Sequence, residues 1–277
     1  MDVKFWGVRG SFPALGFEYT RYGGDTSCVT MDCAGKMLVF DAGSGLVRLG
    51  KTIKGPVDID IFLSHVHLDH VMGLAYFAPL YHPGSRIRIW LEQRIAGLHR
   101  KAIRGLFGPP LHPVKLEKAP AKLEWRTYRA GARFSPRSGV KMIAHPLPHP
   151  GGAMGFRVEH GGQTAVYGVD SGALHGAARI AAVDWGANAD LLILDATFTC
   201  AESEKLPDWG HMSWKEAVEF GIEAQAKRIC LFHHGPDRVD DALDAIATDA
   251  RALSSKAFLA REGMTMVLDR ARAEVPA

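Results

Sequence analysis

Short apolar runs, separated by glycine, proline and polar residues, recur from one end of the chain to the other. Runs of this length that are rich in valine, isoleucine and aromatic residues are typical of β-strands. We expect strands at 3–8, 28–32, 36–40, 59–64, 86–90, 125–128, 140–144, 156–159, 163–169, 191–194, 228–232, 257–261 and 265–268. Glycine-containing turns at 34–35 and 160–162 predict hairpins between the flanking strands, and we expect the last two strands to form a pair.

Longer stretches, in which apolar residues recur every three or four positions, predict helices between these strands. We expect helices at 71–80, 96–107, 213–227 and 239–252. The third has a clear start, because Ser213 is followed by Glu216 in the pattern of a capping box. Strands that alternate with helices predict an α/β (α+β) class, and the 277 residues suit one two-sheet domain over residues 1–277.

The composition is that of a globular protein with a sizeable core, since 47% of the residues are hydrophobic and 23% are charged. The sequence contains no signal-peptide pattern and no apolar run long enough to span a bilayer. The four cysteines show no CxxC spacing, so we expect reduced thiols. These features predict a cytoplasmic protein without a membrane partner.

Basic residues are concentrated in one segment of the chain. The net charge is only +3, but residues 84–137 contain thirteen Lys and Arg against three Glu, a net of +10 that leaves −7 for the remainder. A basic segment in an otherwise acidic chain favours a docking surface for an anion, such as a phosphate-bearing substrate. A solvated, irregular face is the alternative interpretation.

Three histidines and an aspartate follow the expected strand at 59–64 within six positions. His65 and His67 are two residues apart, so at an extended strand end their imidazoles point to the same side. Asp69 and His70 follow where the chain turns. Imidazole and carboxylate groups gathered in this way predict a site for a divalent metal ion, with Zn²⁺ as the first choice.

Polar side chains also follow other apolar strands. Asp170, Asp195 and His233 each come directly after such a run, and His149 precedes two glycines that allow a close backbone approach. One aspartate at a strand end is usually a turn residue, but several such positions together predict a functional site at one sheet edge. Asp41 lies at the end of another strand and has two interpretations: it hydrogen-bonds to a metal ligand and orients it, or it only shapes a turn.

The H-V-H-L-D-H motif and the order of these strand-end residues resemble the metallo-β-lactamase superfamily along nearly the whole chain. The resemblance implies a four-layer αββα sandwich with two divalent metal ions, Zn²⁺ first and Mn²⁺ or Fe²⁺ as alternatives, at one edge of the sheets. It implies that one ion is held by His65, His67 and His149, the other by Asp69, His70 and His233, and that Asp170 bridges them. His234 is the alternative to His233, which strand phase favours because it comes first after the apolar run.

Three further stretches, V-K-F-W-G-V-R-G-S-F-P-A-L-G, D-L-L-I-L-D-A-T-F and G-H-M-S-W, resemble the phosphodiesterase branch. That branch includes the tRNA 3′-processing endonucleases and the phosphonate-pathway cyclic phosphodiesterases. The resemblance implies that Asp69, Asp195 and His211 are catalytic, with Asp195 and His211 as a proton-transfer pair. In the tRNA enzymes the position of Asp195 is a glutamate, preceded by a histidine where this chain has Leu194, and their long tRNA-gripping arm is not evident. A helix-entry cap is the alternative for His211.

The sequence thus predicts a dinuclear metal-dependent hydrolase. We expect a phosphodiesterase that uses a metal-bridging hydroxide to attack a nucleotide-like or cyclic phosphate ester, a small anionic substrate, with nucleic acid as another substrate. The alternatives are a thioester, lactone or β-lactam hydrolase on the same fold and a metal-free, nucleic-acid-binding relative. The resemblance leaves a homodimer open.

Overall fold

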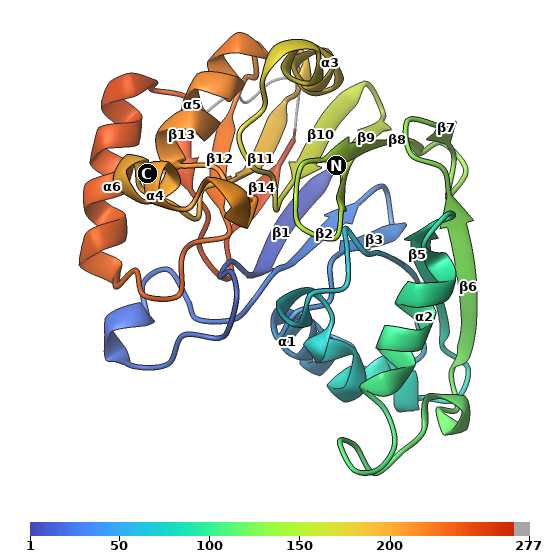
Figure 1. Cartoon of the computed structure of the whole chain (residues 1–277). Coiled ribbons are helices and arrows are strands. Elements are labelled where there is room, and N and C mark those ends of the chain that lie inside the picture. The colour runs from blue at the N-terminus through green and yellow to red at the C-terminus, as the bar shows by residue number, and fades with distance from the viewer. Residues whose placement is uncertain (269–277) are drawn as a thin grey trace.

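Two seven-stranded sheets form the centre of the molecule in the computed structural model, which describes residues 1–268 (Figure 1). The first sheet has the order β14-β1-β2-β3-β4-β5-β6 and the second has the order β13-β12-β11-β10-β9-β8-β7. The strands of the first sheet are β1 (Asp2–Gly7), β2 (Cys28–Asp32), β3 (Met37–Phe40), β4 (Asp58–Phe62), β5 (Arg86–Glu92), β6 (Lys122–Tyr128) and β14 (Thr265–Val267). Those of the second are β7 (Arg133–Phe134), β8 (Lys141–Leu147), β9 (Ala153–His160), β10 (Gln163–Gly168), β11 (Leu191–Asp195), β12 (Ile229–Phe232) and β13 (Ala257–Leu259).

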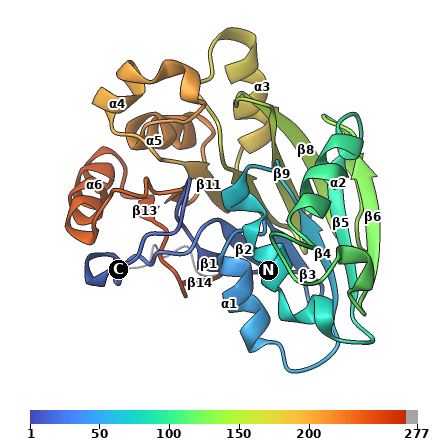
Figure 2. The same ribbon diagram turned by 60° about the horizontal axis from the view of Figure 1, so that its bottom comes forward.

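Helices cover the outer faces of both sheets (Figures 1 and 2). The first sheet carries α1 (Gly45–Thr52) and α2 (Ala96–Gly105), and the second carries α3 (Gly176–Gly186), α5 (Trp214–Glu223) and α6 (Asp240–Leu253). The short α4 (Cys200–Lys205) lies between β11 and α5 in the chain. The layers therefore run helix, sheet, sheet, helix, which confirms the predicted αββα sandwich. Within the described residues no helix is long and apolar enough to cross a membrane.

Strand residues alternate between two cores. In β11, Leu191 and Ile193 face the other sheet, whereas Leu192 and Leu194 pack under the helices. Both faces of this strand are buried, which explains its uninterrupted apolar run. In β4, Ile59 and Ile61 likewise belong to the cluster under α1 and α2. The alternation fixes which strand-end side chains turn toward the space between the sheets.

The predicted helix at 71–80 is wrong, because this stretch forms short 3₁₀ turns: η2 (Leu68–His70), η3 (Met72–Tyr76) and η4 (Ala78–Tyr81). Gly73 packs against backbone so closely that a Cβ there would lie 2.0 Å from the carbonyl oxygen of Gly43. Pro79, near the start of η4, lacks the amide hydrogen that a longer helix would need. Tertiary packing and proline together prevent a regular α-helix.

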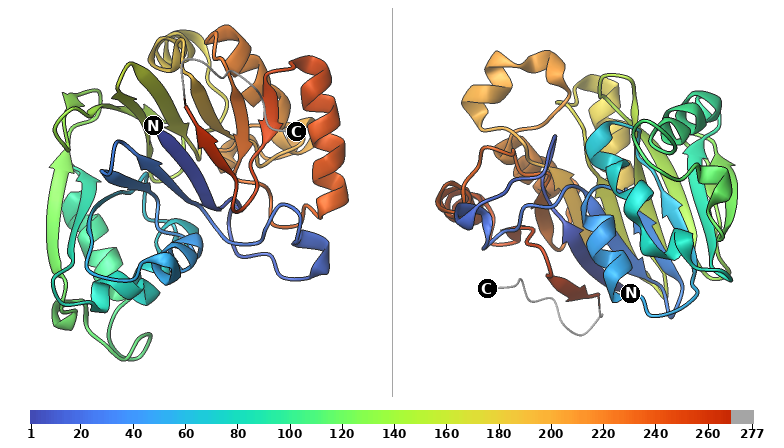
Figure 3. Two further views of the ribbon diagram at one scale, coloured as in Figure 1. Left: turned by 180° about the vertical axis from the view of Figure 1, so that it is seen from behind. Right: turned by 90° about the horizontal axis from the view of Figure 1, so that it is seen from below.

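The last two strands do not pair with each other, contrary to expectation. β13 runs parallel to β12 in the second sheet, and β14 runs antiparallel to β1 in the first (Figure 3). The capping box of α5 is confirmed, since Ser213 caps the helix and Glu216 bonds back to it. Three helices, α1, α3 and α4, were not expected from the apolar pattern.

Parallel strands bring distant parts of the chain to one edge. β3, β4, β5 and β6 are parallel neighbours, and so are β10, β11, β12 and β13. The carboxyl ends of the strands in each run therefore meet at the same edge of their sheet. The polar residues that follow these strands gather there.

Candidate metal centre

Strand ends from both sheets supply the polar side chains of the site. Asp41 follows β3, Asp170 comes shortly after β10, and His233 follows β12. These three residues have φ angles of 58°, 58° and 60°, the left-handed region in which non-glycine residues are strained. Gly10 allows the close approach to His233, because a Cβ there would lie 2.4 Å from the imidazole ring. Backbone strain is thus concentrated where the side chains converge.

One group of potential ligands consists of His65, His67, His149 and Asp170, whose donor atoms all lie within 4.8 Å of one another. Nε2 of His149 is 3.1 Å from Nδ1 of His67 and 3.5 Å from Oδ2 of Asp170. Nε2 of His65 is 3.3 Å from the same carboxylate oxygen. This geometry brings together the four residues that the resemblance to the superfamily implies for one ion and its bridging carboxylate.

A second group consists of Asp69, His70 and His233, and it also contacts Asp170. Oδ2 of Asp69 lies 3.3 Å from Nε2 of His70 and 3.3 Å from Nε2 of His233. His233 Nε2 is 2.9 Å from Oδ1 of Asp170, whereas His70 Nε2 is 3.3 Å from Oδ2. The Asp170 carboxylate therefore lies between the two groups, where the resemblance to the superfamily implies a bridging ligand.

The outer nitrogens of four histidines are fixed by neighbouring groups. Nδ1 lies within hydrogen-bond distance of an oxygen in each case: 3.0 Å for His65 and Ser64, 2.8 Å for His70 and Asp41, 2.9 Å for His149 and the Gly210 carbonyl, and 2.8 Å for His233 and Thr197. This arrangement leaves Nε2 to face the centre. Supports of this kind orient metal-binding imidazoles.

The donor set fits divalent cations. Within residues 1–268, His65 Nε2 and Asp170 Oδ1 are buried without a hydrogen bond of normal geometry. Burial and the neighbouring His70 lower the pKa of His65 well below its ordinary value, so its imidazole is neutral with a free lone pair. Burial also opposes a charge on His233, but Asp170 and Asp69 raise its pKa to about 10. The carboxylates of Asp170 and Asp69 thus favour a positive charge in this buried site. Bound divalent ions would supply that charge.

Asp195 and His211 form a contact beside this centre. Nδ1 of His211 lies 2.7 Å from Oδ2 of Asp195, which is fully buried. Burial opposes the charged imidazole, but Asp195 outweighs it and raises the pKa of His211. The His211 ring lies 5.2 Å from the His149 ring and 5.2 Å from the His233 ring. The aspartate, although shorter than a glutamate, reaches the histidine.

Two other histidines stay outside the cluster. His234 turns away from it, and its Nε2 lies 2.9 Å from the carbonyl oxygen of Ala260. His145 stacks on Trp185 with ring centroids 5.0 Å apart, as a partly buried packing residue. The geometry therefore brings His233, rather than His234, to the candidate centre.

Two supporting hydroxyl groups were missed by sequence reasoning. Thr197 Oγ1 lies 2.9 Å from Oδ1 of Asp195 and 2.8 Å from Nδ1 of His233, so it links the two parts of the site. Tyr167 donates a hydrogen bond of 2.8 Å to Asp41 across the two sheets. Thr197 could have been found from its place just after a strand-end aspartate, whereas Tyr167 reads as a core aromatic residue of a strand.

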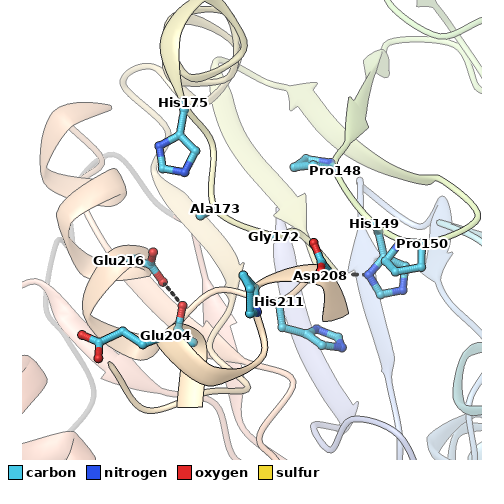
Figure 4. A pocket seen from close by; sticks show the side chains of 13 residues that line it. Pro148, His149, Pro150, Gly172, Ala173, His175, Glu204, Asp208, His211 and Glu216 are labelled. Atoms are coloured by element: carbon cyan, nitrogen blue, oxygen red, sulfur yellow. Dashed lines mark hydrogen bonds between the residues drawn. The ribbon is translucent and has the colours of Figure 1, made fainter. Parts of the chain in front are cut away.

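Two hollows adjoin His211. The larger, of about 600 Å³, is lined by His149 and His211 and by the carboxylates of Glu204, Asp208 and Glu216. In Figure 4, His211 lies between His149 and Glu204. The smaller hollow, of about 330 Å³, reaches His211 from the side of Ser11 and Thr197. A substrate at the candidate centre therefore has room on two sides.

The basic segment at 84–137 forms β5, α2, η5 (Leu116–Lys118), β6 and β7. Ion pairs neutralise part of it, with Glu124 as the shared partner of Arg86, Lys122 and Arg126. Arg94 and Arg129 follow the parallel strands β5 and β6 and line a hollow of about 560 Å³. They lie at the same sheet edge as the histidines, while the role of the segment in anion docking stays a prediction.

Known proteins resemble this chain in sequence. A family model described as a β-lactamase superfamily domain matches residues 36–234. A ribonuclease Z from Halobacterium salinarum is 25% identical over 308 residues, which cover 96% of this chain and 96% of that protein. The similarity thus spans both sheets and every strand end of the candidate centre.

Solved structures resemble it in fold. The short form of human tRNase Z has a TM-score of 0.69 at 22% identity and covers 97% of this chain and 100% of its own. A diphosphatase of the PhnP family has a TM-score of 0.69 at 19% identity, over 96% of this chain and 97% of its own. Both likenesses extend over nearly the whole length of the compared chains.

Proposed function

Because the chain belongs to the β-lactamase superfamily, we propose that it is a metal-dependent phosphodiesterase that acts on nucleotide-like phosphate esters. One observation carries the proposal: two groups of imidazole and carboxylate side chains, mostly buried, both contact Asp170 and lie beside the Asp195–His211 pair. The first group suits one divalent ion and the second suits another. The pair beside them suits proton transfer to an ester oxygen.

In this proposal, His65, His67 and His149 would hold one ion and Asp69, His70 and His233 would hold the other, with Asp170 as the carboxylate shared by the two groups. Nitrogen and oxygen donors together favour Zn²⁺, and the same set accepts Mn²⁺ or Fe²⁺. Bound divalent ions lower the pKa of a water molecule and polarise a phosphoryl oxygen. The supporting groups Ser64, Asp41, Thr197 and the Gly210 carbonyl keep the imidazoles aimed at the centre.

His211 has the role of general acid. Asp195 accepts a hydrogen bond from Nδ1, so Nε2 is the nitrogen available to a substrate. The two Thr197 donors, its amide and its hydroxyl, lie 3.0 Å and 2.9 Å from Oδ1 of Asp195 and fix that carboxylate. His211 then donates its proton to the oxygen that leaves the phosphorus atom.

Phosphate esters are favoured over thioesters, lactones and β-lactams. A thiolate leaves readily without a proton, so the Asp195–His211 pair argues against a thioester. It does not separate phosphate esters from lactones or β-lactams, whose leaving oxygen or nitrogen must also be protonated. Arg129 adds positive charge at the edge where an anion would enter, whereas Arg94 is paired with Glu92. The relative from Halobacterium salinarum is named ribonuclease Z, which supports a phosphodiester bond as the target and RNA as one substrate class.

Metal content and phosphodiester hydrolysis, measured on the same sample, test the proposal. We expect about two divalent ions per chain by elemental analysis and turnover of bis(p-nitrophenyl) phosphate that a chelator abolishes. Turnover should return when Zn²⁺ or Mn²⁺ is added back. Two ions without phosphodiester turnover would contradict the proposed reaction and direct the search to thioesters and lactones. A chain that binds no metal would refute the site assignment.

A further inference from the structure

Two exposed aromatic rings border the smaller hollow next to His211. Phe12 and Trp209 have 54% and 61% of their surface exposed, and both line this hollow of about 330 Å³. Thr197 and His211 lie on its inner side. The hollow therefore connects directly to the proposed proton donor, and its walls present large apolar faces to water.

The two rings come from different parts of the chain. Phe12 lies in the loop after β1, and Trp209 ends η6 (Pro207–Trp209). Gly210 follows Trp209 with a φ of 75°, and a Cβ there would lie 2.4 Å from Pro150. This tight packing holds the tryptophan segment against the loop that carries His149. Exposed aromatic side chains that are held at a site, rather than scattered over the surface, indicate a ligand contact.

The polar rim of the hollow favours an uncharged occupant. Arg238 is the one Lys or Arg among the described residues that line this hollow, and it forms an ion pair with Glu202. Asp237 adds a negative charge at the same rim. A second phosphate group would be repelled here, whereas carboxylate and hydroxyl groups at the rim offer hydrogen bonds to the edge of a neutral ring.

The larger hollow has a different lining. Glu204, Asp208 and Glu216 line it, and its described lining residues include no Phe, Tyr or Trp. Carboxylates accept hydrogen bonds from hydroxyl groups but offer no surface for stacking. Among the two hollows, the smaller one therefore offers an aromatic substituent of the substrate the larger aromatic side chains, Phe12 and Trp209.

We propose that the smaller hollow is a nucleobase subsite, in which Phe12 and Trp209 stack against the base of a substrate. This inference rests on the proposed phosphodiesterase function and specifies that the phosphate ester substrate carries a nucleobase. Base–aromatic stacking tolerates any base, because every base has a π-face. The subsite would thus favour nucleotide esters as a class and discriminate against phosphate esters that carry no base.

Calorimetric titration of the metal-loaded protein with AMP and with ribose 5-phosphate tests the subsite. The two ligands share the sugar and the phosphate, so their ratio of Kd values isolates the base. We expect AMP to bind at least about tenfold more tightly. The variant Phe12→Ala/Trp209→Ala should bind the two ligands with nearly equal Kd, whereas Trp209→Phe should keep most of the preference for AMP.

Phe17→Ala is the matched control, because Phe17 is 89% exposed in the same loop but does not line the hollow. It should leave the AMP preference unchanged. An equal Kd for AMP and ribose 5-phosphate in the unaltered protein, or an AMP preference that survives in the double variant, would overturn the inference. Thermal unfolding checks that all variants are folded.

Two further arms complete the experiment. A short single-stranded RNA is titrated in parallel: tighter binding than AMP indicates that the base belongs to a polynucleotide, and equal Kd values indicate a mononucleotide. Hydrolysis of bis(p-nitrophenyl) phosphate reports separately on the proposed function. Turnover without an AMP preference refutes only the subsite, whereas an AMP preference without turnover supports the subsite and refutes the proposed reaction.

Discussion

Asp41 lies behind the candidate metal centre, and its removal tests how the two sheets support the site. Its carboxylate is fully buried and lies 2.8 Å from each of four groups: the amide and hydroxyl of Ser64, Nδ1 of His70 and the hydroxyl of Tyr167. A carboxylate only accepts hydrogen bonds, so all four groups are donors. Asp41→Ala would leave them without this acceptor.

The expected loss of stability follows from this count. A buried donor left without a partner lowers the free energy of unfolding by about 1–3 kcal/mol. Water that enters the space of the missing carboxylate accepts some of these hydrogen bonds and so reduces the loss. We therefore expect the free energy of unfolding to fall by about 3–5 kcal/mol. The affinity for metal should fall about 10–100-fold as well, because His70 loses the group that orients it.

A double-mutant cycle with Tyr167→Phe makes this reasoning sharper. Tyr167 is buried, and burial together with Asp41 raises the pKa of its hydroxyl well above the ordinary value, so it stays a neutral donor. Alone, Tyr167→Phe should cost about 1 kcal/mol. In the Asp41→Ala background it should be neutral or stabilising, since it removes a donor that already lacks its acceptor.

Urea unfolding of the chelator-treated protein measures both effects without a contribution from bound metal. Competition with a chromophoric chelator then gives the metal affinity of each variant. The same cost for Tyr167→Phe in both backgrounds would refute the coupling between the sheets. A loss of less than about 1 kcal/mol for Asp41→Ala would show that Asp41 only shapes a turn.

Three further predictions address the ligands, the proton donor and a charge network. His67→Ala should remove about one metal ion per chain without lowering the unfolding temperature of the chelator-treated protein, because the His67 side chain is exposed; elemental analysis should find no such metal loss in His82→Ala, an exposed control. His211→Ala should lower kcat about 10²–10⁴-fold for esters with alkoxide leaving groups and much less for p-nitrophenyl esters, whose leaving group needs no proton; equal losses for both would exclude a general acid. Arg137 and Arg88 hold the pKa of Asp58 below its ordinary value, so this carboxylate stabilises the fold above about pH 4 and the contribution is lost as the pH falls. Arg137→Ala should therefore unfold at a lower urea concentration than the unaltered protein at neutral pH. The difference between the two urea midpoints should become smaller below pH 4, and a difference that does not change with pH would contradict a role for the charge of Asp58.

Local sequence patterns predicted much of the fold because they report local physics. The apolar runs of β10, β11 and β12 reflect burial on both faces, and the capping box of α5 reflects unpaired amides at a helix start. The helix expected at 71–80 failed in part for a non-local reason, since Gly73 packs against the distant Gly43, while Pro79 is a local obstacle. The partners of β13 and β14 are likewise set by the arrangement of both sheets, which no local pattern contains.

The candidate site shows the same division. Asp170, Asp195 and His233 follow apolar runs that stop at a polar residue, so their positions could be predicted from that pattern. The grouping of the ligands into two sets came from the resemblance to the superfamily. Tyr167 and Thr197 could not be assigned a role, because their hydrogen bonds join segments far apart in the chain. Contacts such as that between Tyr167 and Asp41, 126 positions apart, arise only when the sheets pack together.

The order in which the chain is synthesised determines when the residues of the candidate centre can come together. The contact between His70 and His233 joins residues 163 positions apart, and His233 lies beyond nearly all strands of both sheets. A chain that emerges from the ribosome with its amino-terminal end first carries the early histidines long before their partners exist. The full cluster therefore cannot assemble until β12 has been made, so a chain terminated before this strand would retain the early motif but could not form the shared carboxylate–imidazole centre.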